Sequence, residues 1–440
     1  MEIIEGFETA RFELSRQTPT EFYPVSPALK QRLKQMFGTE DPEQAVRQII
    51  DQVRPRGDAA LLDYTLKIDG IKLSSLEISK AQIASAYREL DAGLVAALKL
   101  AAQRIRAFHV RQRDDIWGKA NRPGLGQMVR PLERVGIYVP GGTASYPSTV
   151  LMTAIPARVA GVKEIVLVSP PKPPGTLPPA TLVAADIAQV DRIFCVGGAQ
   201  AIAALAFGTE SIPRVDKICG PGNIFVVLAK KLVYGVVDID ALQGPSEVLI
   251  IADDTANPAY CAADLLAQAE HDPLASAILV TTSPRLAEEV DRELQQQLRG
   301  LARQTIAAES LQNRGKIAVV STMDEAIALA NLYAPEHLCL MVAQAASYVD
   351  RITNAGCVFI GENSPVVLGD YVAGPSHVLP TGGTARFSSP LNTGDFVKLI
   401  NVVTIDPASL KELGQAASTI ARAEGLEAHA KAIEKRLEGK

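Results

Sequence analysis

Histidines that stand beside other polar groups are the side chains in this sequence best suited to chemistry. The chain has five histidines. Four of them lie next to polar residues in short segments, and these are His271, His337, His377 and His429. His109 lies in a basic helical stretch without such company, so we expect an ordinary helix residue there.

Four side chains could hold a metal ion. Gln268 and His271 are three residues apart on a helix predicted to begin at Pro258, so they share one face of it. Asp370 adds a carboxylate and His429 a second imidazole. This set, without a thiolate, suits Zn²⁺, Mn²⁺ or Co²⁺, and open coordination positions would make the site catalytic. His429 also lies on the apolar stripe of a short helix, so an interface residue is the alternative.

Glu336 and His337 are adjacent and follow Pro335 at a predicted joint between a helix and a strand. An acid and an imidazole in this position can supply two proton acceptors to one cleft. A surface ion pair is the alternative.

The cysteines predict neither a disulfide framework nor a thiolate zinc site, because their number is odd and no two are spaced Cys-x-x-Cys. We expect small buried apolar residues. A thiol nucleophile at Cys261 or Cys357 is the alternative, although neither has an activating group beside it in the sequence.

The elements that must position these side chains follow an α/β rhythm. Residues 1–130 have mostly helical spacing, and from residue 131 short β-branched runs alternate with helices. A second such series begins at residue 246, and the last residues are helical again. We therefore predict two tandem Rossmann-like parallel-sheet modules, at 131–245 and 246–385, between helical extensions at 1–130 and 386–440.

Ligands in such modules bind at the carboxyl ends of the strands. We expect the glycine-rich turns to lie there, and these are residues 140–142, 197–198, 220–223 and 244–246. Each could bring backbone N–H groups to a nucleotide, or could be only a tight turn. None is a Gly-x-Gly-x-x-Gly fingerprint, so the turns alone do not identify a dinucleotide site.

Composition points to a soluble cytoplasmic protein. With 44 Lys and Arg against 49 Asp and Glu, the net charge of −5 argues against nucleic acid as a partner. The sequence has no secretory signal and no apolar run of about 20 residues, so no membrane association is expected.

Seven motifs closely resemble the histidinol dehydrogenase family, and the resemblance covers about residues 30–430. They are VGIYVPGG at 135–142, GGAQAIAA at 197–204, KICGPGN at 217–223, GPSEV at 244–248, QAEH at 268–271, APEHL at 334–338 and GPSHVLPT at 374–381. One departure is visible at residues 241–243, where Ala-Leu-Gln stands in place of the family's usual Met-Pro-Ala.

This resemblance implies an aldehyde-dehydrogenase-like fold and an intertwined homodimer. It also implies one Zn²⁺ per subunit and NAD⁺ as the oxidant. Members oxidise L-histidinol by four electrons through an enzyme-held aldehyde to L-histidine, the last steps of histidine biosynthesis. The match assigns the metal to Gln268, His271, Asp370 and His429, with His429 coming from the other subunit.

The remaining roles are also implied residue by residue. Glu336 matches the general base for water, and His337 matches the acceptor of the alcohol proton. The other substrate contacts are Ser246, His377 and Glu424, beside the metal ligands and His337. The NAD⁺ contacts are Tyr138, Gln200 and Asn223.

Three other functions compete with this one. A zinc hydrolase would use Glu336-activated water without NAD⁺, and an aldehyde dehydrogenase would use a thiol such as Cys357. A non-enzymatic scaffold is disfavoured, because a polar constellation is costly to assemble in a cleft.

Overall fold

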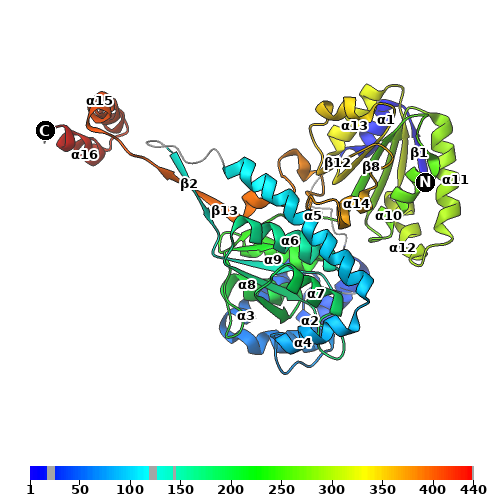
Figure 1. Cartoon of the computed structure of the whole chain (residues 1–440), viewed down its shortest axis with the longest axis horizontal. Coiled ribbons are helices and arrows are strands. Elements are labelled where there is room, and N and C mark those ends of the chain that lie inside the picture. Colours follow the sequence, from blue (N-terminus) through cyan, green and yellow to red (C-terminus); the bar gives the residue numbers. More distant parts are fainter. Residues whose placement is uncertain (17–24, 118–125, 142–144, 439–440) are drawn as a thin grey trace. The chain divides into compact units, whose positions relative to one another are not determined.

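The computed structural model describes residues 1–16, 25–117, 126–141 and 145–438. The chain divides into two compact units, Met1–Arg113 with Pro131–Phe396, and Asp114–Arg130 with Val397–Lys440. In the described residues the first unit contains two parallel sheets (Figure 1). None of the described helices is long and apolar enough to cross a membrane. Gly142, predicted in a glycine-rich turn, lies outside the described residues.

The first sheet has the strand order β5-β4-β3-β6-β7, with all neighbours parallel. The chain adds β4 and β5 on one side of β3, and β6 and β7 on the other. The order therefore reverses between β3 and β6, the kind of switch point where open parallel sheets bind ligands. The strands are β3 (Arg134–Tyr138), β4 (Glu164–Ser169), β5 (Arg192–Cys195), β6 (Lys217–Cys219) and β7 (Asp238–Ile239).

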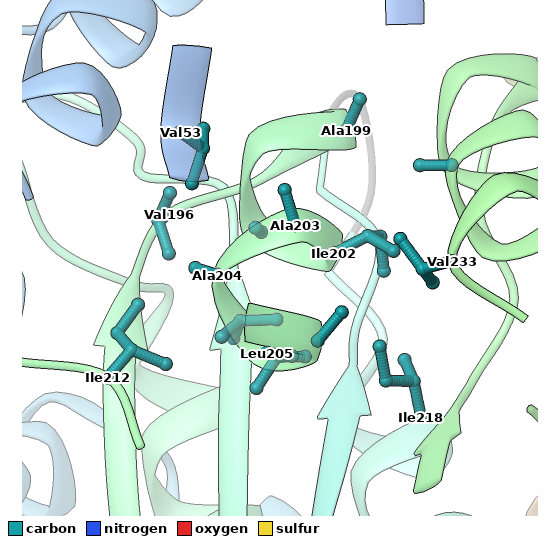
Figure 2. Packing of buried hydrophobic residues seen from close by; sticks show 14 of the residues in the cluster. Val53, Val196, Ala199, Ile202, Ala203, Ala204, Leu205, Ile212, Ile218 and Val233 are labelled. Carbon is teal, nitrogen blue, oxygen red and sulfur yellow. The ribbon is translucent and has the colours of Figure 1, made fainter. Parts of the chain in front are cut away.

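Helices cover this sheet because their apolar residues form one core with it. Figure 2 shows Ile202 and Leu205 of α8 among Val53 of α3, Ile218 of β6 and Val233 of α9. The helices of this module are α6 (Pro147–Ala160), α7 (Pro179–Ile187), α8 (Gly198–Phe207) and α9 (Ile224–Val233), and α3 (Pro42–Tyr64) packs against them from the N-terminal region.

The second sheet has the order β1-β10-β9-β8-β11-β12, again parallel throughout. Its strands are β1 (Glu2–Glu5), β8 (Glu247–Ala252), β9 (Ser276–Thr281), β10 (Lys316–Val319), β11 (His337–Met341) and β12 (Cys357–Ile360). Its helices are α1 (Phe7–Leu14), α10 (Pro258–Ala269), α11 (Pro284–Leu298), α12 (Gln304–Arg314), α13 (Met323–Tyr333) and α14 (Val366–Tyr371). The predicted fold of two tandem Rossmann-like modules is confirmed.

The N-terminal region is mostly helical, as predicted, but it begins with a strand. Its remaining helices are α2 (Pro27–Phe37), α4 (Lys80–Glu89) and α5 (Ala92–Trp117). Strand β1 pairs with β10, and Ile4 is buried with Ala10 and Leu14 in the core of the second sheet (Figure 1). Four residues are too few for a sequence periodicity, and their partner strand lies far away in the chain.

The second unit also contains strands that the sequence analysis did not expect. Strand β13 (Val397–Val402) pairs with β2 (Gly126–Pro131), ahead of helices α15 (Pro407–Ala423) and α16 (Glu427–Glu438). On the apolar stripe of α16, Ile433 and Leu437 lie against Gly414 of α15. Part of that stripe is therefore covered within the chain, while Leu426 remains 42% exposed.

Candidate active site

In the first sheet the predicted site residues lie at the carboxyl ends of the strands, whereas in the second sheet they lie at the amino ends. In the first sheet Tyr138 is the last residue of β3, and Gln200 and Asn223 follow β5 and β6, so all three lie at the expected carboxyl edge. In the second sheet Ser246 directly precedes β8, and His337 is the first residue of β11. The prediction of the carboxyl edge was wrong for this sheet, because the turn 244–246 leads into β8 at its amino end.

The Glu336 carboxyl is buried immediately before β11. Its Oε2 accepts hydrogen bonds from Ser246 Oγ at 2.6 Å and from the Glu247 backbone N–H at 2.8 Å. Burial raises the pKa of Glu336 to about 7. The group is thus poised near neutral pH, where a general base is most effective.

The hydrogen bonds of His337 define which ring nitrogen is basic. Its Nδ1 lies 2.9 Å from the backbone oxygen of Glu247, and a carbonyl can only accept, so Nδ1 carries a proton. The buried Nε2 has no hydrogen-bond partner among the described residues and lies 3.4 Å from Asp370 Oδ1. Burial opposes a charge on the ring, but the Glu336 and Asp370 carboxylates outweigh it and raise the pKa of His337 to about 9.

Three of the four predicted metal ligands belong to the first unit. Gln268 lies near the end of α10, and Asp370 lies on α14. The prediction that His271 shares a face of the same helix was wrong, because α10 ends at Ala269 and His271 lies just beyond it. Desolvation by neighbouring groups lowers the pKa of His271, against the pull of Asp370, although the residue as a whole is exposed. In the described ranges, no group of three His, Cys, Asp or Glu side chains could hold a metal ion.

These three residues fit a divalent cation by their chemistry. An amide oxygen, an imidazole nitrogen and a carboxylate oxygen make up a mixed N/O donor set that suits Zn²⁺, Mn²⁺ or Co²⁺. Gln268 is 3% exposed, and its Nε2 is buried with no partner in the described part of the chain. The lowered pKa of His271 favours the neutral ring, the form in which an imidazole binds a metal.

His377 is held between two segments of the first unit. Its Nδ1–H donates to the backbone oxygen of Asp370 at 2.8 Å, and its Nε2 lies 3.2 Å from Thr149 Oγ1 on α6. A cavity of about 320 Å³ joins His337, Asp370 and His377, with apolar walls that include Phe359. One concave space thus contains a basic nitrogen, a carboxylate and a second imidazole.

Glu424 and His429 belong to the second unit. Glu424 caps the end of α15, His429 lies in the first turn of α16, and both are exposed. Their predicted roles in the site described above remain predictions.

The predicted dinucleotide residues surround the turns of the first sheet. Tyr138 is buried, and its hydroxyl oxygen accepts from the Gly198 N–H at 3.1 Å. Gln200 is fully buried, and neither of its amide atoms has a partner among the described residues. Asn223 Oδ1 accepts the first N–H groups of α9, at 3.1 and 3.3 Å. Gly220 has a φ of +114°, and a Cβ there would lie 2.1 Å from Tyr138 O, so glycine is required.

The cysteines are all free, and none has the environment of an activated thiol. Burial raises the pKa of Cys261 to about 12 and that of Cys357 to about 11, so both thiols are protonated at neutral pH. Cys357 lines the cavity, but a nucleophilic cysteine needs a lowered pKa.

Sequence analysis missed three residues that form hydrogen bonds with the predicted site residues or with their partners. They are Arg16, Thr149 and Glu247. Glu247 lies inside the motif at 244–248, whereas no motif marks Arg16 or Thr149.

Comparison with known proteins finds the same family that the sequence motifs resemble. The sequence profile of the family described as "Histidinol dehydrogenase" matches residues 33–437. The histidinol dehydrogenase of Dehalococcoides mccartyi strain 195 is 58% identical, over 100% of both chains. That of Halalkalibacterium halodurans is 52% identical, over 91% of this chain and 95% of its own.

A solved structure agrees as well. The crystal structure of histidinol dehydrogenase from Elizabethkingia anophelis is 36% identical, with a TM-score of 0.90, over 100% of this chain and 98% of that one. From the profile match and these identities, the chain belongs to the histidinol dehydrogenase family of oxidoreductases.

Proposed function

We propose that this enzyme oxidises L-histidinol to L-histidine through L-histidinaldehyde, with zinc and two molecules of NAD⁺. The reaction converts histidinol, water and two NAD⁺ into histidine, two NADH and three protons. One observation carries the proposal: Glu336 and His337 are adjacent bases in different hydrogen-bonded states at the edge of one sheet. A four-electron oxidation needs two such bases, because it removes an alcohol proton and then activates water.

His337 acts in the alcohol oxidation. Its Nδ1–H is engaged by the Glu247 carbonyl, so the ring offers only Nε2 to the substrate hydroxyl. The Glu336 and Asp370 carboxylates raise the pKa of His337, and a zinc ion held by Asp370 would oppose this effect, which favours the neutral ring whose Nε2 can accept a proton. Nε2 takes that proton while the C–H bond releases hydride. NAD⁺, bound by Tyr138, Gln200 and Asn223, accepts the hydride in each of the two oxidations.

Glu336 acts in the aldehyde oxidation. Both of its hydrogen bonds end on Oε2, so neither engages Oε1. Oε1 removes a proton from water as the water adds to the aldehyde carbon, and the hydrate then loses the second hydride. The cavity retains the aldehyde between the two steps.

Zinc fits the donors already described. We propose that Gln268, His271 and Asp370 hold one Zn²⁺ per subunit together with His429 of the second subunit in a homodimer. When bound, zinc orients the substrate's nitrogen atoms and offsets the negative charge of Asp370 beside His337. Ser246, His377 and Glu424 complete the contacts to histidinol, with Glu424 also supplied by the second subunit. The exposed positions of Glu424 and His429 support this sharing.

The test is the NADH yield per histidinol, before and after removal of metal by a chelator. We expect two NADH per histidine formed, loss of both after chelation, and recovery with zinc. One NADH with aldehyde release would contradict the four-electron reaction. Amide hydrolysis without NADH would instead support the zinc hydrolase.

The cellular setting follows from the same assignment. Histidine biosynthesis needs NAD⁺, and we infer a cytoplasmic enzyme, which the five free cysteines support.

A further inference from the structure

The main chain of Glu247 contacts both proposed catalytic bases. Its N–H donates to Glu336 Oε2 at 2.8 Å, and its carbonyl accepts from His337 Nδ1 at 2.9 Å. The first contact orients the Glu336 carboxylate, and the second determines the tautomer of the His337 ring. A shift of this one residue would therefore displace both bases at once.

The side chain of Glu247 is itself fixed by an arginine from the N-terminal segment. Arg16 NH1 donates to Oε1 at 2.6 Å and Arg16 NH2 donates to Oε2 at 2.7 Å, while the Gly382 N–H also approaches Oε1 at 3.3 Å. Two parallel bonds of this kind fix the position and the plane of a carboxylate. Glu247 is 5% exposed, so the pair lies largely out of water.

Arg16 is also attached to the segment that carries the two bases. Its Nε–H donates to the backbone oxygen of Tyr333 at 2.9 Å, and its guanidinium carbon lies 3.9 Å from the centre of the Tyr333 ring. Tyr333 ends α13, three residues before Glu336. Arg16 thus ties the start of β8 to the joint between α13 and β11.

Arg16 owes its own position to the core of the second sheet. It follows α1, whose Ala10 and Leu14 are buried against residues of β8, β10 and α13. It also lies outside residues 33–437, the range that matches the family profile. No contact with the cavity is needed for this arginine to act on the chemistry.

We propose that Arg16 is a positioning residue that, through Glu247, aligns Glu336 and His337 for both oxidation steps. This inference rests on the roles proposed above for the two bases. Replacing both partners of a buried ion pair by apolar residues often costs no stability, so a stabilising role alone does not account for a charged pair at this place.

The central experiment measures kcat and KM of Arg16→Met, separately with histidinol and with histidinaldehyde. We expect kcat to fall roughly 10–100-fold in both assays, because a small misplacement of a base is costly, while KM for substrate and NAD⁺ stays unchanged. Arg16→Lys retains the charge but not the fork, so it should recover part of kcat. Thermal unfolding is measured in parallel.

The chain offers a matched control in Arg192. This arginine makes a bidentate pair with Glu77, with both bonds at 2.8 Å, and lies 4.9 Å from the ring of Phe194. The pair joins the N-terminal region to β5 of the first sheet. Arg192→Met should lower the unfolding temperature and leave kcat unchanged.

Glu247→Gln tests whether Arg16 acts through Glu247. It weakens the same ion pair while leaving the backbone contacts of residue 247 possible. We expect it to lower kcat as Arg16→Met does, and the double variant to be no worse than either single variant. Additive losses would mean that Arg16 does not act through Glu247. A folded Arg16→Met with normal kcat would overturn the proposal, and if that variant does not fold, normal kcat in both Arg16→Lys and Glu247→Gln would do the same.

Two reference variants separate this inference from the proposed function. If Glu336→Gln and His337→Asn lose activity while the Arg16 and Glu247 variants retain it, only the positioning role is wrong. If Glu336→Gln and His337→Asn keep normal activity, the roles of the two bases are wrong, and the positioning role falls with them.

Discussion

At the scale of single residues, Glu336 separates the two oxidation steps. An amide in place of the carboxylate can still accept the hydrogen bonds of Ser246 and Glu247, but it cannot take a proton from water. We therefore expect Glu336→Gln to lower aldehyde oxidation about 10²–10⁴-fold and to leave most alcohol oxidation intact. A single-turnover assay with histidinol should yield one NADH per site. Histidine production at the normal rate would contradict this role.

The pH dependence of the second step should follow the same carboxyl. Burial raises the pKa of Glu336 to about 7, and only the ionised form accepts a proton, so aldehyde oxidation should rise with pH through a midpoint near that value and level off above it. The Ser246 hydroxyl stabilises the ionised form. Ser246→Ala should therefore move the midpoint of kcat/KM for histidinaldehyde to higher pH.

Ser310→Ala provides the comparison for that midpoint. Ser310 is another buried hydroxyl, which donates to the backbone oxygen of Ala275 at 2.9 Å and does not contact Glu336. Its removal should leave the midpoint unchanged. A profile for Ser246→Ala that matches the unaltered enzyme would count against the role of this hydrogen bond.

Sequence analysis could predict the residues whose types and spacing indicate chemistry. It missed the residues that only position those side chains. Glu336 beside His337, and Gln268 three residues before His271, are visible as short spacings of reactive groups. Arg16 is visible only in space, because its partner Glu247 is far away in the chain and the contact that matters is made by backbone atoms.

At the scale of elements, helices α10 and α14 place the proposed metal donors near the amino ends of the strands in the second sheet. His271→Asn and Asp370→Asn each remove a strong donor, so we expect zinc content and activity to fall together. Gln268→Ala should have a milder effect, because a neutral amide oxygen is a weaker donor. Metal analysis of the purified variants provides the measurement.

Asp253→Asn is the control for these variants. Asp253 follows β8 at the opposite edge of the same sheet, and its Oδ2 accepts from the Ala343 N–H at 2.9 Å. Zinc content should be normal in this variant. Normal zinc in His271→Asn and Asp370→Asn as well would contradict the proposed metal site.

The alternation of strands and helices could be predicted from composition and periodicity. The position of the site residues at the amino ends of the strands in the second sheet could not. A general rule places ligands at carboxyl ends, and Tyr138 obeys it. His337 does not, because it is the first residue of β11 and its ring contacts Glu247, the first residue of β8.

At the scale of the whole molecule, the proposed sharing of sites predicts complementation between inactive chains. A mixture of His271→Asn and His429→Asn chains should form heterodimers in which one site carries both substitutions and the other carries neither. Activity of about half per heterodimer would then return, since each two-fold dimer has two equivalent sites. No recovery, with subunit exchange demonstrated, would mean that His429 acts within its own chain.

The pairing of β1 with β10 has a consequence for how the polypeptide is made. The residues of β1 are synthesised about 300 residues before their partner at Lys316–Val319. During synthesis this strand, Glu-Ile-Ile-Glu, stays unpaired until β10 has been made, and unpaired strands are prone to aggregation. Arg16 follows α1, so its guanidinium can reach Glu247 and Tyr333 only after the chain has been made through the end of α13. The segment of β1 and Arg16 thus takes its place in the enzyme only after most of this chain has been synthesised.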